Sequence, residues 1–373
     1  MKKVGILTFH SSNNYGALLQ CYALKSTIES LGFNVSIINL RKEYIKDYQH
    51  LSYLKKNENL LKKKITDLVF QREFDVFRDK YLRAQFTREV RQVEDMEQFS
   101  DAFDAIVVGS DQVWRYAYTK KTFYSFFLDF VDDQTKKISY AASFGLDYFE
   151  GSSEVEKKAK ELVKRFTAVS VREAQGVDIC NKHFGIDAVH VLDPVFLKSK
   201  EQYTSEIIDL ENEKETSEKY VAYYLLNPDE FRENLISQVL DTKNIDKKLN
   251  IYTNKKFNIK RPEFPLSKFK FKSFTKWLSG IKNAEFIITD SFHGLCFSII
   301  FDKQFICIAN KLRGASRMES LLRNFGLEDR LVYEDQKNID LKNISKIDYS
   351  KVNLILEDKK RKSLKFLKNS LLN

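Results

Sequence analysis

The stretch Val4–Leu40, "VGILTFHSSNNYGALLQCYALKSTIESLGFNVSIINL", decides the fold. It opens with the apolar run "VGILTF", which is typical of a short buried strand, and the polar loop "HSSNNYG" follows. Residues 17–32 are amphipathic and end in a glycine, as a capped helix does. The segment "NVSIINL" then begins a second strand. A strand, a helix and a strand in this order predict parallel pairing with a right-handed crossover.

The same alternation recurs along the chain. Apolar runs that end in small or polar residues occupy 105–111, 137–145, 168–173 and 189–194. After a polar segment that reaches about residue 219, similar runs return, among them "YVAYYLLN", "EFIITDS" and "FICIA". We therefore expect an α/β protein with two Rossmann-like domains and with its site at the carboxyl ends of the strands. The expected limits are residues 1–200, 215–345 and, for a basic C-terminal helix that packs back on both domains, 350–373.

Length and composition set the class of protein. The chain has 373 residues, 43% of them hydrophobic, which is enough for two cores. The chain has no stretch of about 18 apolar residues, so no membrane span is predicted. The short N-terminal apolar run is typical of a strand and not of a secretion signal. Four scattered cysteines without CxxC spacing fit a reducing cytoplasm. His190 and Asp193 at one strand end are too few for a metal site, so we expect neither metal nor cofactor.

The net charge of +10 is uneven. Eleven Lys and Arg residues against two acids lie between Lys243 and Lys276, and "KKRKSLKFLKN" at 359–369 forms a second cluster. Such clusters favour anionic partners, although a solvated lysine-rich surface has the same composition. No zinc finger or other nucleic-acid module is recognisable, so nucleic acid is not an expected partner. Peripheral contact with an anionic membrane is the most that the charge predicts.

Candidate residues in the first domain follow its predicted strands. The loop "SNNYG" leads into a helix, where N–H groups attract anions, or it is a tight turn capped by asparagine; its candidates are Asn14, Tyr15 and Gly16. The run "VVGSDQVW" suits contact with a phosphate or a sugar hydroxyl, or it ends in an aspartate that caps the next helix; its candidates are Gly109, Ser110 and Asp111.

Two further strand ends carry a serine and an arginine. Ser143 follows the run "SYAA" and is either a site residue or part of a turn. Arg172 comes directly after "AVSV". An arginine there can bind a carboxylate or phosphate through two N–H groups, or it can pair with the adjacent Glu173. The strand-end position favours a site role for Arg172.

The second domain contributes "FIITDSFHGLCFSIIF", Phe286–Phe301. His293 is its strongest candidate, because histidine is the usual general acid or base near neutral pH. Ser291 and Gly294 flank it at a predicted helix start, which favours an anionic ligand; the alternative is a core histidine bonded to a backbone carbonyl. Shortly after the next strand, a basic loop suits phosphate binding or is a solvated charged turn, and its cations are Lys311, Arg313 and Arg317.

The order of these motifs resembles the polysaccharide pyruvyl transferase family over roughly residues 3–330. The resemblance implies two Rossmann-like domains facing a cleft, as in B-type glycosyltransferases. It also implies transfer of a pyruvyl group from phosphoenolpyruvate to a sugar of a surface or exported polysaccharide, usually as a cyclic ketal. The acceptor is then a glycan or a lipid-linked saccharide. Arg172 and His293 correspond to the residues that the family associates with its donor.

One position departs from the family pattern. Many members have arginine two residues before the histidine, where this chain has Ser291. Either the basic residues at 311, 313 and 317 replace that arginine, or the donor differs. On this interpretation His293 is the proton donor or phosphate partner, and Asp111 is the base. The alternatives are a glycosyltransferase that uses a nucleotide sugar in the same cleft, and a family member without catalytic activity.

Overall fold

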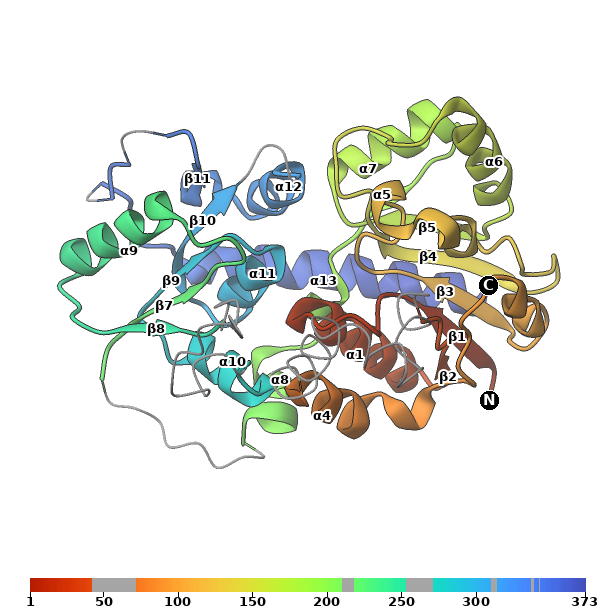
Figure 1. Ribbon diagram of the computed structural model, residues 1–373, viewed down its shortest axis with the longest axis horizontal. Coiled ribbons are helices and arrows are strands. Elements are labelled where there is room, and N and C mark those ends of the chain that lie inside the picture. Colours follow the sequence, from red (N-terminus) through yellow and green to blue (C-terminus); the bar gives the residue numbers. More distant parts are fainter. Residues whose placement is uncertain (42–71, 210–217, 253–270, 310–313, 337–338, 342) are drawn as a thin grey trace, which may run out of the picture.

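The computed structural model describes residues 1–41, 72–209, 218–252, 271–309, 314–336, 339–341 and 343–373. Two parallel sheets lie next to one another, each with helices on its faces (Figure 1). The predicted fold class, α/β with two Rossmann-like halves, is confirmed. The domain limits themselves stay a prediction, and Lys311 and Arg313 lie outside the described residues.

The first sheet has the order β2-β1-β3-β4-β5-β6, with every pair parallel. Buried β-branched and aliphatic residues dominate its strands, as expected for a sheet covered on both faces. The strands are β1 (Lys3–Leu7), β2 (Asn34–Ile37), β3 (Ala105–Val108), β4 (Lys136–Ala142), β5 (Ala168–Val171) and β6 (Val189–His190). Each falls within an apolar run that the sequence predicts as a strand or begins one residue before it.

The second sheet is also parallel, with the order β11-β10-β9-β7-β8. Its strands are β7 (Val221–Tyr224), β8 (Lys248–Asn250), β9 (Phe286–Thr289), β10 (Gln304–Ala309) and β11 (Leu331–Tyr333). In each sheet the strand order reverses at one point, between β1 and β3 and between β7 and β9. Open α/β sheets bind ligands beyond the carboxyl ends of the strands at such a reversal.

Helix α1 (Tyr15–Ser30) connects β1 to β2 and packs against both halves of the protein. Asn14 caps it, because its Oδ1 accepts from Ala17 N at 3.1 Å. Leu24 faces the core of the first sheet, whereas Leu18 belongs to a core that continues into the second domain. The helix is therefore buried almost all round, unlike the one-faced amphipathic helix that its sequence suggests.

The remaining helices cover the sheets and join them. They are α4 (Arg72–Tyr81), α5 (Tyr116–Thr119), α6 (Ser153–Val163), α7 (Ala174–Ile179), α8 (Lys200–Tyr203), α9 (Glu230–Lys243), α10 (Phe274–Lys282), α11 (Phe292–Ile300), α12 (Ser316–Phe325) and α13 (Tyr349–Leu372). Helix α13 runs across both halves (Figure 1): Leu367 and Leu371 pack on the first sheet and Val352 on the second-domain core. None of the described helices is both long and apolar enough to cross a membrane.

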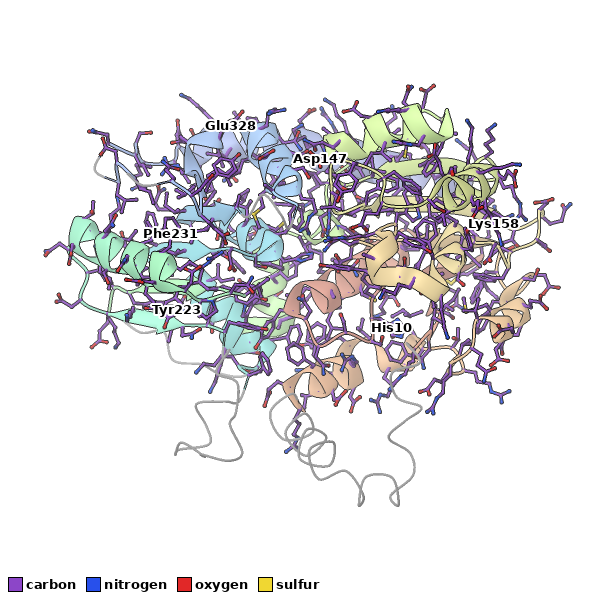
Figure 2. All side chains as sticks on the ribbon, turned by 45° about the horizontal axis from the view of Figure 1, so that its top comes forward. His10, Asp147, Lys158, Tyr223, Phe231 and Glu328 are labelled. Atoms are coloured by element: carbon purple, nitrogen blue, oxygen red, sulfur yellow. The ribbon has the colours of Figure 1, made fainter. Side chains whose placement is uncertain are left out.

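The two domains share one continuous core. Tyr15 of α1 stacks on Trp277 of α10, with ring centres 5.1 Å apart and planes 9° from parallel. The Tyr15 hydroxyl donates to the carbonyl of Lys272 at 2.7 Å. Side chains from both halves meet along this seam (Figure 2). Burying large aromatic rings across the seam stabilises one relative placement of the domains.

Candidate active site between the two sheets

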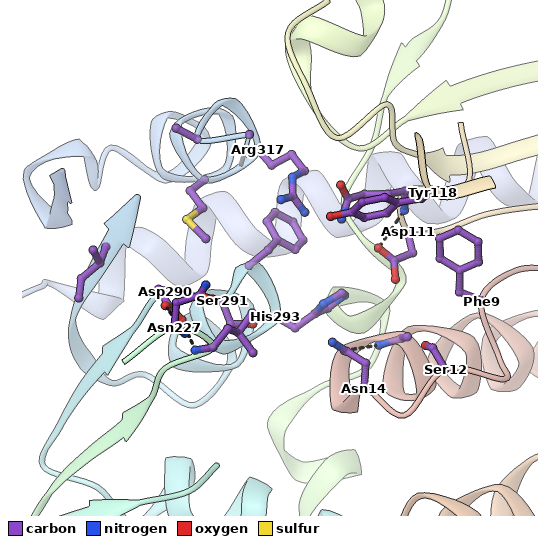
Figure 3. Close-up of a pocket in the computed structure, with 18 of the residues that line it drawn as sticks. Phe9, Ser12, Asn14, Asp111, Tyr118, Asn227, Asp290, Ser291, His293 and Arg317 are labelled. Carbon is purple, nitrogen blue, oxygen red and sulfur yellow. Dashed lines mark hydrogen bonds between the residues drawn. The ribbon is translucent and has the colours of Figure 1, made fainter. Parts of the chain in front are cut away.

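A cavity of about 560 Å³ lies where the carboxyl ends of the two sheets face each other. Its walls come from the segments after β1, β2 and β3 on one side, with Arg41 following β2, and from the loops after β7, β9 and β10 on the other. Figure 3 labels ten of the lining residues: Phe9, Ser12, Asn14, Asp111 and Tyr118 from the first domain, and Asn227, Asp290, Ser291, His293 and Arg317 from the second. The cavity thus joins the two points where strand order reverses.

His293 lies in the first turn of α11 and is almost fully buried. Ser291 caps this helix, with its Oγ accepting from Gly294 N at 3.4 Å. Among the described residues His293 is the only histidine that lines the cavity. Its Nε2 is buried and has no hydrogen-bond partner in the described part of the chain. The nearest carboxylate oxygen, Asp193 Oδ2, is 3.6 Å away.

Gly16 lies against the Nδ1 edge of the His293 ring. A Cβ atom on Gly16 would lie 2.0 Å from His293 Nδ1, so any larger residue would displace the imidazole. Gly16 and Asp193 both belong to the first domain, whereas His293 belongs to the second. The histidine therefore sits in a recess formed by the opposite domain. Its position depends on how the two domains are docked.

Asp193 is a buried carboxylate that sequence analysis did not place in the site. Its Oδ2 accepts from Ser110 Oγ at 3.0 Å and from Arg172 Nη1 at 2.9 Å, and its Oδ1 accepts from Val195 N. Burial alone would raise the pKa of Asp193, but His293 and Arg172 lower it overall, well below its ordinary range. Asp193 is therefore a buried anion that links Arg172 of the first domain to His293 of the second.

Arg172 is surrounded by acids and does not line the cavity. Its guanidinium nitrogens lie 2.9 Å from Asp193, 3.6 Å from Asp111 and 3.9 Å from Glu173. Burial alone would lower the pKa of Arg172, but these carboxylates raise it overall. The sequence allowed Arg172 either a site role or an ion pair with Glu173. In the structure Arg172 pairs with acids, Glu173 included, and it lies directly behind the cavity wall that carries Asp111.

Asp111 lines the cavity, and its backbone conformation is unusual. Its φ of 73° lies in the left-handed region, which costs energy for a residue other than glycine and is frequent at functional sites. Position 109 has room only for glycine, because a Cβ there would lie 2.4 Å from the Tyr140 carbonyl oxygen. Ser110 is buried behind the cavity, where it donates to Asp193. The chain turn therefore exposes Asp111 and hides Ser110.

Glu173 and Ser143 form a second buried pair. Ser143 Oγ donates to Glu173 Oε1 at 2.9 Å, and Phe144 N donates to the same oxygen at 2.9 Å. Burial raises the pKa of Glu173, and the neighbouring arginines and these hydrogen bonds only partly oppose it. Ser143 thus holds Glu173 and does not line the cavity.

Arg317 brings a cation to the cavity from the first turn of α12. Its guanidinium lies 5.9 Å from the centre of the Phe292 ring, and that of Arg172 lies 4.3 Å from the same ring. Burial and the nearby charge of Arg172 lower the pKa of Arg317 to about 10. Arg317 remains a cation at neutral pH, on the wall that also carries His293 and Ser291.

Asp290 and Gly294 shape the second-domain wall. Asp290 accepts from Leu226 N at 2.6 Å, from Asn227 N at 3.1 Å and from Arg232 Nε at 3.1 Å, which fixes the loop after β7. Burial raises the pKa of Asp290, and these donors oppose the effect. A Cβ on Gly294 would lie 2.3 Å from Thr289 Oγ1, so this glycine is required for close packing of α11 on β9.

Apart from Lys311 and Arg313, which lie outside the described residues, the structure thus separates the residues predicted for the site into four groups. Five line the cavity, namely Asn14, Asp111, Ser291, His293 and Arg317. Ser110, Ser143 and Arg172 lie in the buried network behind it, and Tyr15 and Gly16 lie in the interface between the domains. Gly109 and Gly294 permit close backbone contacts. In the described residues no group of three or more His, Cys, Asp or Glu side chains is arranged to hold a metal ion.

Comparison with known proteins identifies the kind of chain that carries this site. A family model described as polysaccharide pyruvyl transferase matches residues 14–311, most of the chain. Residues 14–311 include Asp111, Arg172, Asp193 and His293. No curated protein matches the sequence.

Solved structures share the fold at low sequence identity. The UDP-GlcNAc 2-epimerase of Neisseria meningitidis, bound to UDP-GlcNAc, has a TM-score of 0.52 and 10% identity, covering 96% of this chain and 99% of that one. The UDP-GlcNAc 2-epimerase of Methanocaldococcus jannaschii has a TM-score of 0.48, 15% identity and the same coverage. A spinosyn forosaminyltransferase has a TM-score of 0.41 and 9% identity, covering 99% and 94%. The similarity to the Neisseria enzyme supports the two-domain Rossmann-like architecture.

Proposed function

This chain belongs to the polysaccharide pyruvyl transferase family, and we propose that it transfers a pyruvyl group from phosphoenolpyruvate to a sugar of a surface or exported polysaccharide. By its family it is a transferase. The observation that supports the proposal best is the cavity between the domains, where His293 and Arg317 stand on one wall and Asp111 on the other. Ketal formation from an anionic enol ester needs a cation, an acid and a base, and Arg317, His293 and Asp111 can supply these three groups.

The proposed reaction begins at the methylene carbon of the donor. A protein acid protonates this carbon, which becomes the methyl group and leaves an oxocarbenium-like centre at the adjacent carbon. One sugar hydroxyl adds there and loses its proton to a base. The carbon–oxygen bond to phosphate then breaks, and a second hydroxyl closes the ring as its proton leaves. The products are a carboxylated ketal and inorganic phosphate.

The cavity residues divide these tasks. We assign the acid step to His293, with Asp193 holding its ring from the first domain. Arg317 stabilises the negative charge of the donor and of the leaving phosphate, because it is a cation on the wall that carries His293. Asp111 is the proposed base for the sugar hydroxyls. Arg172 pairs with Asp193 and lies behind Asp111, and it does not itself hold the donor.

Phosphate release from phosphoenolpyruvate tests this assignment. Nitrophenyl glycosides and lipid-linked saccharides serve as acceptors. Acid–base assistance contributes about 10²–10⁴-fold, so His293→Gln should lower kcat by that factor without unfolding the protein. His183→Gln is the matched control, since His183 pairs with Glu156 away from the cavity. A His293→Gln variant with unchanged turnover would remove the histidine from the chemistry.

Ligand-dependent thermal stability separates the proposed donor from nucleotide sugars. A ligand that binds the folded state alone raises the unfolding temperature, by an amount that grows with the logarithm of ligand concentration above Kd. We expect stabilisation by phosphoenolpyruvate and none by UDP-sugars. Stabilisation by UDP-sugars alone would favour a glycosyltransferase, and stabilisation by neither would favour a family member without catalytic activity.

The acceptor is proposed to be lipid-linked and to reach the enzyme at an anionic membrane surface. The observation behind this proposal is the basic sequence 359–369 on α13. Each Lys or Arg near such a surface contributes about 1 kcal/mol to binding. We expect co-sedimentation with vesicles that contain anionic lipid and loss of it in neutral vesicles. Equal sedimentation with both kinds of vesicle, or with neither, would argue against the membrane contact.

A further inference from the structure

Two aromatic rings form part of the first-domain wall of the cavity. Tyr118, in α5, is 46% exposed and lines the cavity near Asp111 (Figure 3). Phe9, in the loop after β1, lines the same wall. Neither residue has a role in the reaction steps described above. Partly exposed rings inside a polar cavity are the usual means of binding a ligand with an apolar face.

Both rings are held in place by neighbours outside the cavity. The Arg115 guanidinium lies 4.3 Å from the centre of the Tyr118 ring. Arg115 is itself fixed, because its Nη1 donates to Gln112 Oε1 at 3.1 Å and its Nε lies 3.6 Å from Glu150. Phe9 meets Phe126 edge to face, with ring centres 5.4 Å apart. A ligand that stacks on these rings therefore meets surfaces that are already ordered, which reduces the entropic cost of binding.

The groups around the rings suit a sugar. Ser12, Asn14 and Gln112 line the same side of the cavity as Phe9 and Tyr118, and all three carry neutral polar groups. A pyranose ring has a face of C–H groups, which stacks on an aromatic ring, and a rim of hydroxyls, which need neutral donors and acceptors. The opposite wall carries Arg317 and His293, which suit an anion. The first-domain wall thus combines two aromatic rings and neutral polar groups with the charged side chains of Asp111 and Arg41, and the second-domain wall carries Arg317 and His293.

We propose that Tyr118, assisted by Phe9, is the stacking platform for a pyranose ring of the acceptor and directs its hydroxyls toward Asp111. The platform also lies near the proposed donor groups, since Tyr118 and Arg317 line the same cavity (Figure 3). That the sugar is the acceptor rests on the proposed function. That a pyranose binds at this wall rests on the rings and polar groups alone.

Saturation-transfer NMR tests the platform without the donor. The probe is a mixture of the methyl pyranosides of glucose, galactose, mannose and N-acetylglucosamine. We expect transfer to ring C–H protons in the wild type and in Tyr118→Phe, and loss of at least most of it in Tyr118→Ala. Tyr148→Ala is the control, because Tyr148 is 58% exposed and does not line the cavity. No transfer from any of the four sugars, or equal transfer in Tyr118→Ala, would overturn the proposal.

Steady-state kinetics then separate this proposal from the proposed function. Tyr118→Ala should raise KM for the glycoside about three- to tenfold, the factor expected for one aromatic contact, and leave KM for phosphoenolpyruvate nearly unchanged. Sugar binding that depends on Tyr118, without any turnover of phosphoenolpyruvate, would refute the donor and leave the platform standing. Turnover with unchanged KM for the glycoside in Tyr118→Ala would refute the platform and leave the donor standing.

Discussion

Replacing Asp193 by asparagine tests whether the two domains are joined through a buried charge. Asparagine keeps the shape of the side chain, and its single amide oxygen can still accept from Val195 N, but its NH2 group takes the place of the oxygen that accepts from Ser110 Oγ. It removes the negative charge that faces Arg172 Nη1 at 2.9 Å and His293 Nε2 at 3.6 Å. The substitution therefore removes the charge and the Oδ2 acceptor of Asp193 and keeps the volume of its side chain.

The size of the effect follows from the surroundings of Arg172. Breaking a buried ion pair by removing one partner costs about 3–5 kcal/mol, because the other charge is left without compensation. Arg172 still has Asp111 and Glu173 at 3.6 and 3.9 Å, so compensation is partial. We expect a loss of about 3 kcal/mol in the free energy of unfolding at neutral pH, the lower end of that range.

The dependence on pH has a defined sign. The pKa of Asp193 in the folded protein lies below its ordinary value of about 3.9 in an unfolded chain. A depressed carboxylate pKa adds stability at pH values above about 4, and that stability is lost as the pH falls through the folded value. The difference between wild type and Asp193→Asn should therefore be largest at neutral pH and shrink below about pH 4.

Urea unfolding followed by tryptophan fluorescence and far-UV circular dichroism measures this difference. Asp187→Asn is the matched control, because Asp187 is an exposed carboxylate in the same part of the chain, and it should change stability by less than about 0.5 kcal/mol. Two results would refute the reasoning: an Asp193→Asn protein as stable as the wild type at neutral pH, or a difference that does not change between neutral and acidic pH.

Substitutions of Gly16 and Ser291 test how His293 is positioned. Gly16→Ala should destabilise the docked domains and lower turnover, because its Cβ would overlap His293 Nδ1. The stability loss, measured by urea unfolding, should be smaller when His293 is also alanine. Additive effects in the double variant would show that the two residues are not in contact. Ser291→Ala should cost about 0.5–1 kcal/mol, since it removes the cap of α11, and Ser152→Ala, which removes the cap of the exposed helix α6, should cost a similar amount or less. A Ser291→Ala protein that loses several kcal/mol would mean that Ser291 has a role beyond capping.

The inner strands of both sheets were predictable from sequence because they are buried on both faces. Such strands read as continuous apolar runs, and the polar residues that end them mark the edge where ligands bind. For this reason Asp111 and His293 are predictable at strand ends, and both line the cavity. Their chemical roles stay predictions.

The role of Asp193 in the site could not be predicted from the sequence, because its partners are distant along the chain. Ser110 lies 83 residues away and Arg172 lies 21 residues away, and His293 belongs to the other domain. Only the docking of the two sheets reveals this set. Arg172 illustrates the converse: its strand-end position indicated a ligand contact, but the fold surrounds its guanidinium with three carboxylates.

The most direct test of the account is incubation of the protein with phosphoenolpyruvate and lipid-linked saccharides extracted from the cells that produce it. Released phosphate and the ketal methyl signal of the glycan are measured together. We expect both to appear in equal amounts and both to fall with His293→Gln. Phosphoenolpyruvate that remains intact with every extracted saccharide, or phosphate that appears without a ketal, would contradict it.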